Sequence, residues 1–105
     1  MMVTLGDYVT RVYLPFAEST LRFSTASNYG TMWGKHFASR PHITRKLLGD
    51  VRTSDVYAWL GEIVATDKTE NGETLGAATV KRLKSLLSGI FTHAVDLGYL
   101  QTANP

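Results

Sequence analysis

Apolar residues recur every three or four positions in four stretches of this chain, at residues 5–16, 24–38, 53–65 and 77–97. This spacing places the apolar side chains of each stretch on one side of a helix. The last stretch has the longest stripe, formed by Val80, Leu83, Leu87, Ile90, Ala94 and Leu97 and widened by Leu86 and Phe91. No stretch shows the strict alternation of a half-buried strand. The pattern therefore predicts an all-α fold, a compact bundle of four main helices.

Cap and breaker residues predict where the first two helices begin and end. Thr4 is a candidate N-cap of the first helix. Pro15 disfavours helical backbone at the preceding Leu14, so we expect the first helix to end or kink there. Ser24 or Thr25 is expected to cap the second helix.

Glycines and hydroxyl residues mark the remaining boundaries. Gly30 and Gly34 either weaken the second helix or mark a close contact with another helix. Thr53 is the expected cap of the third helix, and Gly98 the expected left-handed C-cap of the fourth. The polar stretch 66–76 contains an Asn-Gly pair and is expected to be a loop with a tight turn.

The composition is that of one folded domain. The chain has 105 residues, of which 44% are hydrophobic and 19% charged, and its net charge is only +2, so any basic surface must come from local clustering. It contains no cysteine, which excludes disulfides and thiolate metal sites. No apolar run approaches the length of a membrane span, and no signal peptide is recognisable at the N-terminus. We expect a soluble, cytoplasmic protein with no membrane partner.

Candidate catalytic and metal-binding residues are few. The spacing of the three histidines, His36, His42 and His93, matches no metal motif, and we expect no acidic residue to cluster with any of them. The acidic residues of the 66–76 loop, Asp67, Glu70 and Glu73, are expected to be solubilising. No nucleophile motif is present. We therefore expect a non-catalytic chain with no cofactor, metal or small-molecule substrate.

The charges of the fourth helix are unusual. Lys81, Arg82 and Lys84 lie in its first turns, where the helix dipole favours anions, and its only acid, Asp96, lies at the other end. Each such cation costs on the order of 0.3–1 kcal/mol when it is exposed. Two interpretations are open: an ordinary solvated face that happens to be basic, or a face that binds an external anion such as phosphate.

The second and fourth helices share this chemistry, because each has an apolar side and an opposite side of small polar residues and cations. Such side chains can enter a DNA major groove and neutralise phosphates. The candidate DNA-contacting residues are Thr25, Ser27, Asn28, Thr31 and Lys35 in the second helix, and Thr79, Lys81, Arg82, Lys84 and Ser85 in the fourth. The alternative is a helical protein-interaction module that exposes Leu86, Ile90 or Phe91 to a partner helix.

Three blocks of sequence carry a resemblance to a known family. They are Thr25-Ala26-Ser27-Asn28-Tyr29, the passage 48–56 (LGDVRTSDV), and residues 79–100 followed by Asn104-Pro105. In their order and spacing these blocks are similar to the core-binding domain (SAM-like, N-terminal) of phage integrases and related tyrosine recombinases. Together they span nearly the whole chain.

The resemblance implies a function and a wider context. In the family, this domain forms half of a C-shaped clamp on duplex DNA, and its second and fourth helices face the major groove near the crossover site. The catalytic residues belong to a following domain, so Tyr99 is expected to pack rather than to act as the nucleophile. The chain would then be a DNA-binding fragment that ends at the Asn-Pro linker of a prophage or mobile-element integrase. The parent protein would act in DNA integration and recombination as a tetramer on DNA, associated with the bacterial nucleoid.

Overall fold

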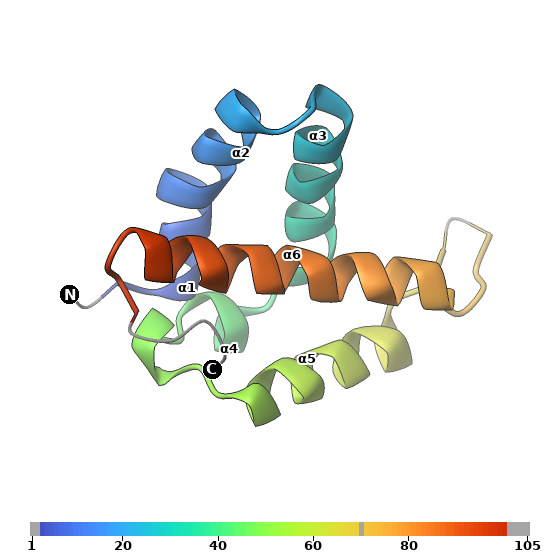
Figure 1. Cartoon of the computed structure of the whole chain (residues 1–105). Helices are drawn as coiled ribbons and strands as arrows, with labels where there is room; N and C mark the ends of the chain where they lie inside the picture. Colours follow the sequence, from blue (N-terminus) through green and yellow to red (C-terminus); the bar gives the residue numbers. More distant parts are fainter. Residues whose placement is uncertain (1–2, 70, 101–105) are drawn as a thin grey trace.

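The computed structural model describes residues 3–69 and 71–100, and within them the chain is mostly helical (Figure 1). The elements are α1 (Leu5–Tyr8), the π-helical turn η1 (Val9–Tyr13), α2 (Leu14–Thr20), α3 (Phe23–Met32), the π-helical turn η2 (Trp33–Phe37), α4 (Pro41–Thr44), the 3₁₀ turn η3 (Leu48–Asp50), α5 (Thr53–Thr66) and α6 (Ala77–Asp96). Within the described ranges β-type pairing is limited to two isolated bridges, Thr4 with Leu47 and Lys68 with Thr74. The predicted all-α bundle is confirmed.

The first predicted helix continues through Pro15. Segments α1, η1 and α2 follow one another without a break from Leu5 to Thr20. In η1 the backbone widens, and the Leu14 N–H donates to the carbonyl of Val9, five residues earlier. Pro15 therefore lies in the first turn of the renewed α-helix, where a missing N–H is tolerated. The predicted end of the helix at Leu14 was wrong, because the π-helical turn accommodates Pro15 without a break in the helix. Thr4 caps α1 as predicted, since its hydroxyl accepts from the Asp7 N–H at 3.2 Å.

The second predicted helix corresponds to α3 and η2, which together run from Phe23 to Phe37. It begins earlier than expected, because Arg22 rather than Ser24 or Thr25 occupies the N-cap position. Only Leu21 and Arg22 connect α2 to α3, so these helices form a hairpin. The tip of this hairpin projects beyond the rest of the molecule (Figure 1).

The boundaries of α5 and α6 are close to those predicted. Thr53 was wrong as the predicted cap, because it is the first residue of α5; Arg52 holds the N-cap position, where its backbone N–H donates to Asp55 Oδ2 at 2.8 Å. Gly98 has a φ of 83° directly after α6, as expected for a left-handed C-cap. In the 67–76 connection the predicted turn is present, with Gly72 at a φ of 78°.

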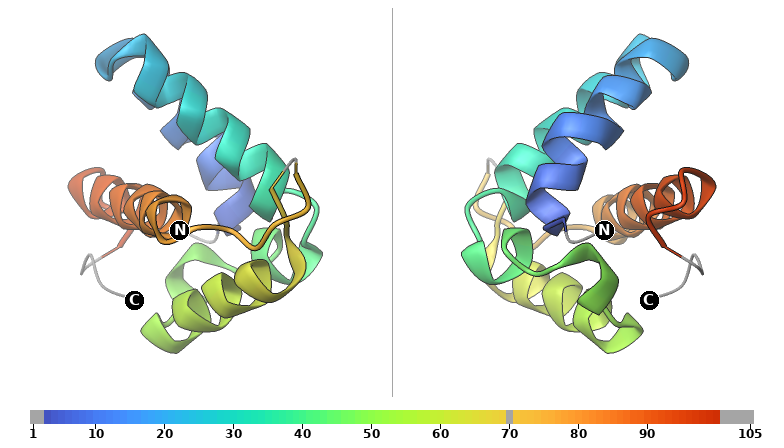
Figure 2. Two further views of the ribbon diagram at one scale, coloured as in Figure 1. Left: turned by 90° about the vertical axis from the view of Figure 1, so that its right-hand side faces the viewer. Right: turned by 90° about the vertical axis from the view of Figure 1, so that its left-hand side faces the viewer.

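Helix α6 packs between the other long helices. It crosses the α2–α3 hairpin on one side and lies beside α5 on the other (Figures 1 and 2). The four aromatic residues predicted to be core, Trp33, Phe37, Trp59 and Phe91, are all buried. So are Leu86 and Ile90, which have 0% exposure. The protein-interaction alternative, as stated from the sequence, was therefore wrong about the residues that would be exposed.

One close approach fixes the position of α6 against the first helix. A Cβ atom at Gly89 would lie 2.7 Å from the hydroxyl oxygen of Tyr13, so a side chain at position 89 would require this hydroxyl group to shift. By contrast, a Cβ at Gly30 or Gly34 would meet nothing within 4 Å. The suggestion that these two glycines mark a close helix contact is thus wrong, and Gly89 has that role.

Candidate nucleic-acid interface

The polar side of α6 is open to solvent along its length. Lys81, Lys84, Ser85 and Ser88 are exposed, whereas Leu83 and Leu87 on the opposite side are buried. The helix therefore separates its apolar and polar residues as the 3.6-residue period requires. The apolar side holds α6 in the core, and the polar side is presented outward.

The cations at the start of α6 have no intramolecular counter-ion in the described part of the chain. Gly76 is the N-cap of α6, no acidic residue lies in the first turn, and neither Lys81 nor Arg82 forms an ion pair there. Among the Lys and Arg residues of the described ranges, only Arg40 and Lys46 form ion pairs; Lys46 Nζ, for example, lies 3.2 Å from Asp55 Oδ2. The positive end of the α6 dipole and its unneutralised cations together favour an external anion.

Lys84 differs from its two neighbours because it has a partner on another helix. Its Nζ lies over the ring of Tyr57 in α5, 5.5 Å from the ring centroid. This is a cation–π distance. The ammonium group remains on the exposed side of α6, since the lysine itself is exposed.

The second set of candidate residues lies on α3 and η2. Ser27, Asn28, Thr31 and Lys35 are exposed there, and in the described part of the chain Lys35 has no ion-pair partner. Thr25 is half-buried. At about 100° per residue it lies on the side of α3 opposite Ser27.

Thr79 is placed like Thr25. It is half-buried and lies two residues, or about 200°, from Lys81 around α6. Of the ten candidate residues, eight are therefore exposed on the polar sides of the two helices, and Thr25 and Thr79 are turned partly into the protein.

The two polar sides border different hollows of the surface. Ser27 and Thr31 line one together with Glu18 and Phe23. Ser85 and Ser88 line another together with Phe16 and His93. The two hollows have no lining residue in common. Each helix thus has its own polar strip, and three of the four candidate cations of the two strips lie on α6.

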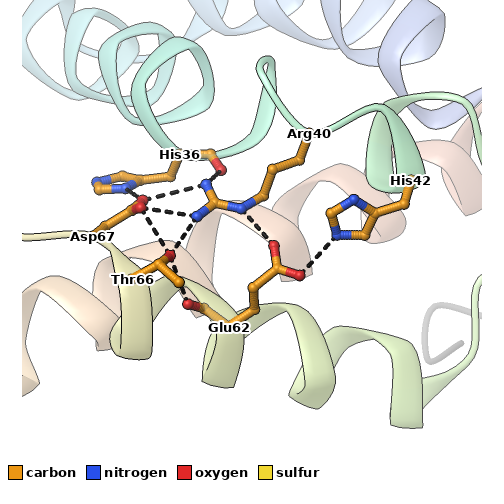
Figure 3. A network of polar contacts seen from close by, with 6 residues as sticks. All are labelled: His36, Arg40, His42, Glu62, Thr66 and Asp67. Atoms are coloured by element: carbon orange, nitrogen blue, oxygen red, sulfur yellow. Dashed lines mark hydrogen bonds and ion pairs between the residues drawn. The ribbon is translucent and has the colours of Figure 1, made fainter.

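A partly buried polar network joins the end of the second helix to the end of α5 (Figure 3). His36 Nδ1 lies 2.6 Å from Asp67 Oδ2, and Arg40 Nη2 lies 2.8 Å from Asp67 Oδ1. Arg40 Nε also reaches Glu62 at 2.5 Å, and Glu62 in turn contacts His42 at 3.0 Å. Arg40 further donates to the carbonyl of His36.

This network corrects two expectations from the sequence. His36 and His42 do have acidic partners, and Asp67 is a member of the network rather than a solubilising loop residue. The Arg40 guanidinium, followed by the His36 hydrogen bond, lowers the pKa of Asp67 to about 2, against the opposing effect of its burial. The described residues contain no group of three or more metal-ligating side chains. We interpret the network as a structural tie.

A second polar contact lies inside the aromatic cluster between the first helix and α6. The Tyr8 hydroxyl and His93 Nδ1 are 2.5 Å apart, and the His93 ring also packs against Phe16 with ring centroids 4.0 Å apart. Burial raises the pKa of Tyr8 to about 12 and lowers that of His93, so an uncharged pair is favoured. Tyr99 packs edge-on against Tyr8, which agrees with the expected packing role.

Comparisons with known proteins add no relative: no family model, no curated protein and no solved structure matches this chain. Within the described residues, no helix combines the length and apolar character needed to cross a bilayer.

Proposed function

We propose that this chain binds duplex DNA, and that the exposed polar side of α6 makes the main contact. One observation carries the proposal: in the described structure Lys81 and Arg82 lie without counter-ions in the second turn of a long helix, and Lys84 and Ser85 follow them at exposed positions. This arrangement is unfavourable in the isolated protein and becomes favourable beside phosphates.

The α3 strip would provide a second contact. Ser27, Asn28 and Thr31 are small enough to approach base edges, and Lys35 can reach a phosphate. Thr25 and Thr79 are less suited to direct contact because they are half-buried. The contacts of α6 with DNA would therefore account for most of the affinity, and the contacts of the α3 strip for a smaller share.

The resemblance in sequence supports a more specific proposal. The chain would be the SAM-like core-binding domain of a tyrosine recombinase that acts in DNA integration, with catalysis supplied by another domain and the full protein assembling as a tetramer on DNA near the bacterial nucleoid. The all-helical architecture and the polar sides of α3 and α6 are compatible with this assignment.

Duplex binding measured against salt tests the DNA proposal. We expect fluorescence anisotropy with a random-sequence duplex to show weak binding. The logarithm of the association constant should fall linearly with the logarithm of the salt concentration. Because each phosphate contact contributes about 0.9 to this slope, the Lys81→Ala/Lys84→Ala variant should flatten it by roughly 2. A matched control is Arg11→Ala/Lys68→Ala, which removes two exposed charges outside α6. Equal slopes for the two variants would contradict the proposal.

A second candidate function is protein interaction through the tip of the α2–α3 hairpin. Phe23 is 87% exposed there, and Leu21, two residues earlier in the chain, is exposed as well. Exposed apolar groups that lie together are typical of protein-binding surfaces. This candidate predicts association that is insensitive to salt, and light scattering beside the anisotropy titration separates the two functions.

A further inference from the structure

We propose that Tyr57 of α5 is a positioning residue for the DNA-binding side of α6, through its contact with Lys84. This inference rests on the proposed function and extends it to a helix that the sequence did not implicate. The observation behind it is that Lys84 Nζ lies 5.5 Å from the centroid of the Tyr57 ring.

The placement of Tyr57 is difficult to explain by core packing. Its side chain is 58% exposed, and it is absent from the buried core around Trp59 and Leu60 in the same helix. Among the described residues it has no aromatic neighbour. Lys84 is the ring's one cationic contact in that part of the chain. The ring thus supports a cation on a neighbouring helix.

The contact matters because of what binding requires of a lysine. A free lysine side chain samples many rotamers, and a phosphate contact must select one of them. A ring beneath the ammonium group restricts those rotamers before the ligand arrives, so less freedom is lost on binding. Lys81 provides the internal comparison, since it lies one turn earlier and no ring supports it in the described structure.

The prediction is that the Tyr57 ring strengthens the Lys84 contact with phosphate. Tyr57→Leu removes the π face but keeps an apolar side chain, and we expect it to weaken duplex binding by about two- to fivefold. Tyr57→Phe keeps the ring and should bind like the wild type. In a Lys84→Ala background, Tyr57→Leu should have no further effect, whereas in a Lys81→Ala background its effect should remain.

The experiment combines anisotropy titrations of these variants with an NMR readout that needs no DNA. The Lys84 ε-methylene protons should carry an upfield ring-current shift that persists in Tyr57→Phe and is lost in Tyr57→Leu. Melting temperatures check that each variant folds. If the wild type does not bind duplex, the proposed function fails and this inference falls with it. Two results would overturn this inference alone, provided that the wild type binds. One is that Tyr57→Leu binds duplex as well as the wild type; the other is that Tyr57→Leu weakens binding as much in the Lys84→Ala background as in the wild-type background.

Discussion

Gly89 of α6 lies directly against Tyr13 of the first helix, so closely that a Cβ at position 89 would come within 2.7 Å of the tyrosine hydroxyl oxygen. The next nearest atom, Tyr13 Cζ, would be at an ordinary contact distance of 3.6 Å. A single oxygen atom therefore decides whether a side chain is tolerated at this crossing.

Gly89→Ala should accordingly have opposite effects in two backgrounds. With Tyr13 present, we expect a loss of about 1 kcal/mol, because overpacking costs about 1–3 kcal/mol and alanine returns about 1 kcal/mol of helix propensity. In a Tyr13→Phe background the oxygen is gone, and the same substitution should stabilise by up to about 1 kcal/mol. Urea denaturation of the four proteins measures this cycle. Additive effects would show that the two residues do not meet.

The local parts of this fold could be predicted from sequence, and the reason is visible in α6. Its apolar stripe, its C-terminal glycine and its exposed cations are all encoded within one helix, where the period alone decides which side is buried. The same holds for Thr4, whose capping bond to Asp7 spans three residues.

Contacts between distant segments could not be predicted in this way. His36 and Asp67 are 31 residues apart, and Arg40 and Glu62 are 22 apart. Nothing in the sequence near Asp67 distinguishes it from the other acids of its loop, because its partners arrive only when η2 packs against the end of α5. The close contact of Gly89 with Tyr13 could not be predicted for the same reason. The spacing of Gly30 and Gly34 suggested a helix contact that the structure does not contain.

The network around Asp67 should make the free energy of unfolding depend on pH in the acid range. The pKa of Asp67 is lowered to about 2 from an ordinary value of 3.8, so the folded state binds its proton less readily than the unfolded state does. Its contribution is complete above pH about 4 and is lost as the pH falls toward 2, with an upper bound of about 2 kcal/mol. Asp67→Asn should remove this dependence and destabilise the protein at neutral pH.

Thermal melts of the wild type and Asp67→Asn between pH 2 and 6 measure the difference. Asp50→Asn is a suitable control, since Asp50 is exposed and forms no side-chain ion pair among the described residues. The gap between the wild type and Asp67→Asn should narrow as the pH falls through this window. A gap that stays constant down to pH 2 would contradict the role assigned to Asp67.

A substitution at the exposed tip of the α2–α3 hairpin distinguishes DNA binding from protein interaction. Phe23→Ser removes the large apolar side chain that is most exposed among the described residues, so the free energy of unfolding should change by no more than about 0.5 kcal/mol. If the chain acts mainly through α6, Phe23→Ser should bind duplex DNA with the same salt slope as the wild type, and Lys81→Ala/Lys84→Ala should scatter light like the wild type.

If the tip is instead a protein-binding surface, Phe23→Ser should abolish association, whereas Lys81→Ala/Lys84→Ala should associate like the wild type. The two substitutions lie on different elements, so each serves as the control for the other, and only a chain that uses both surfaces would respond to both.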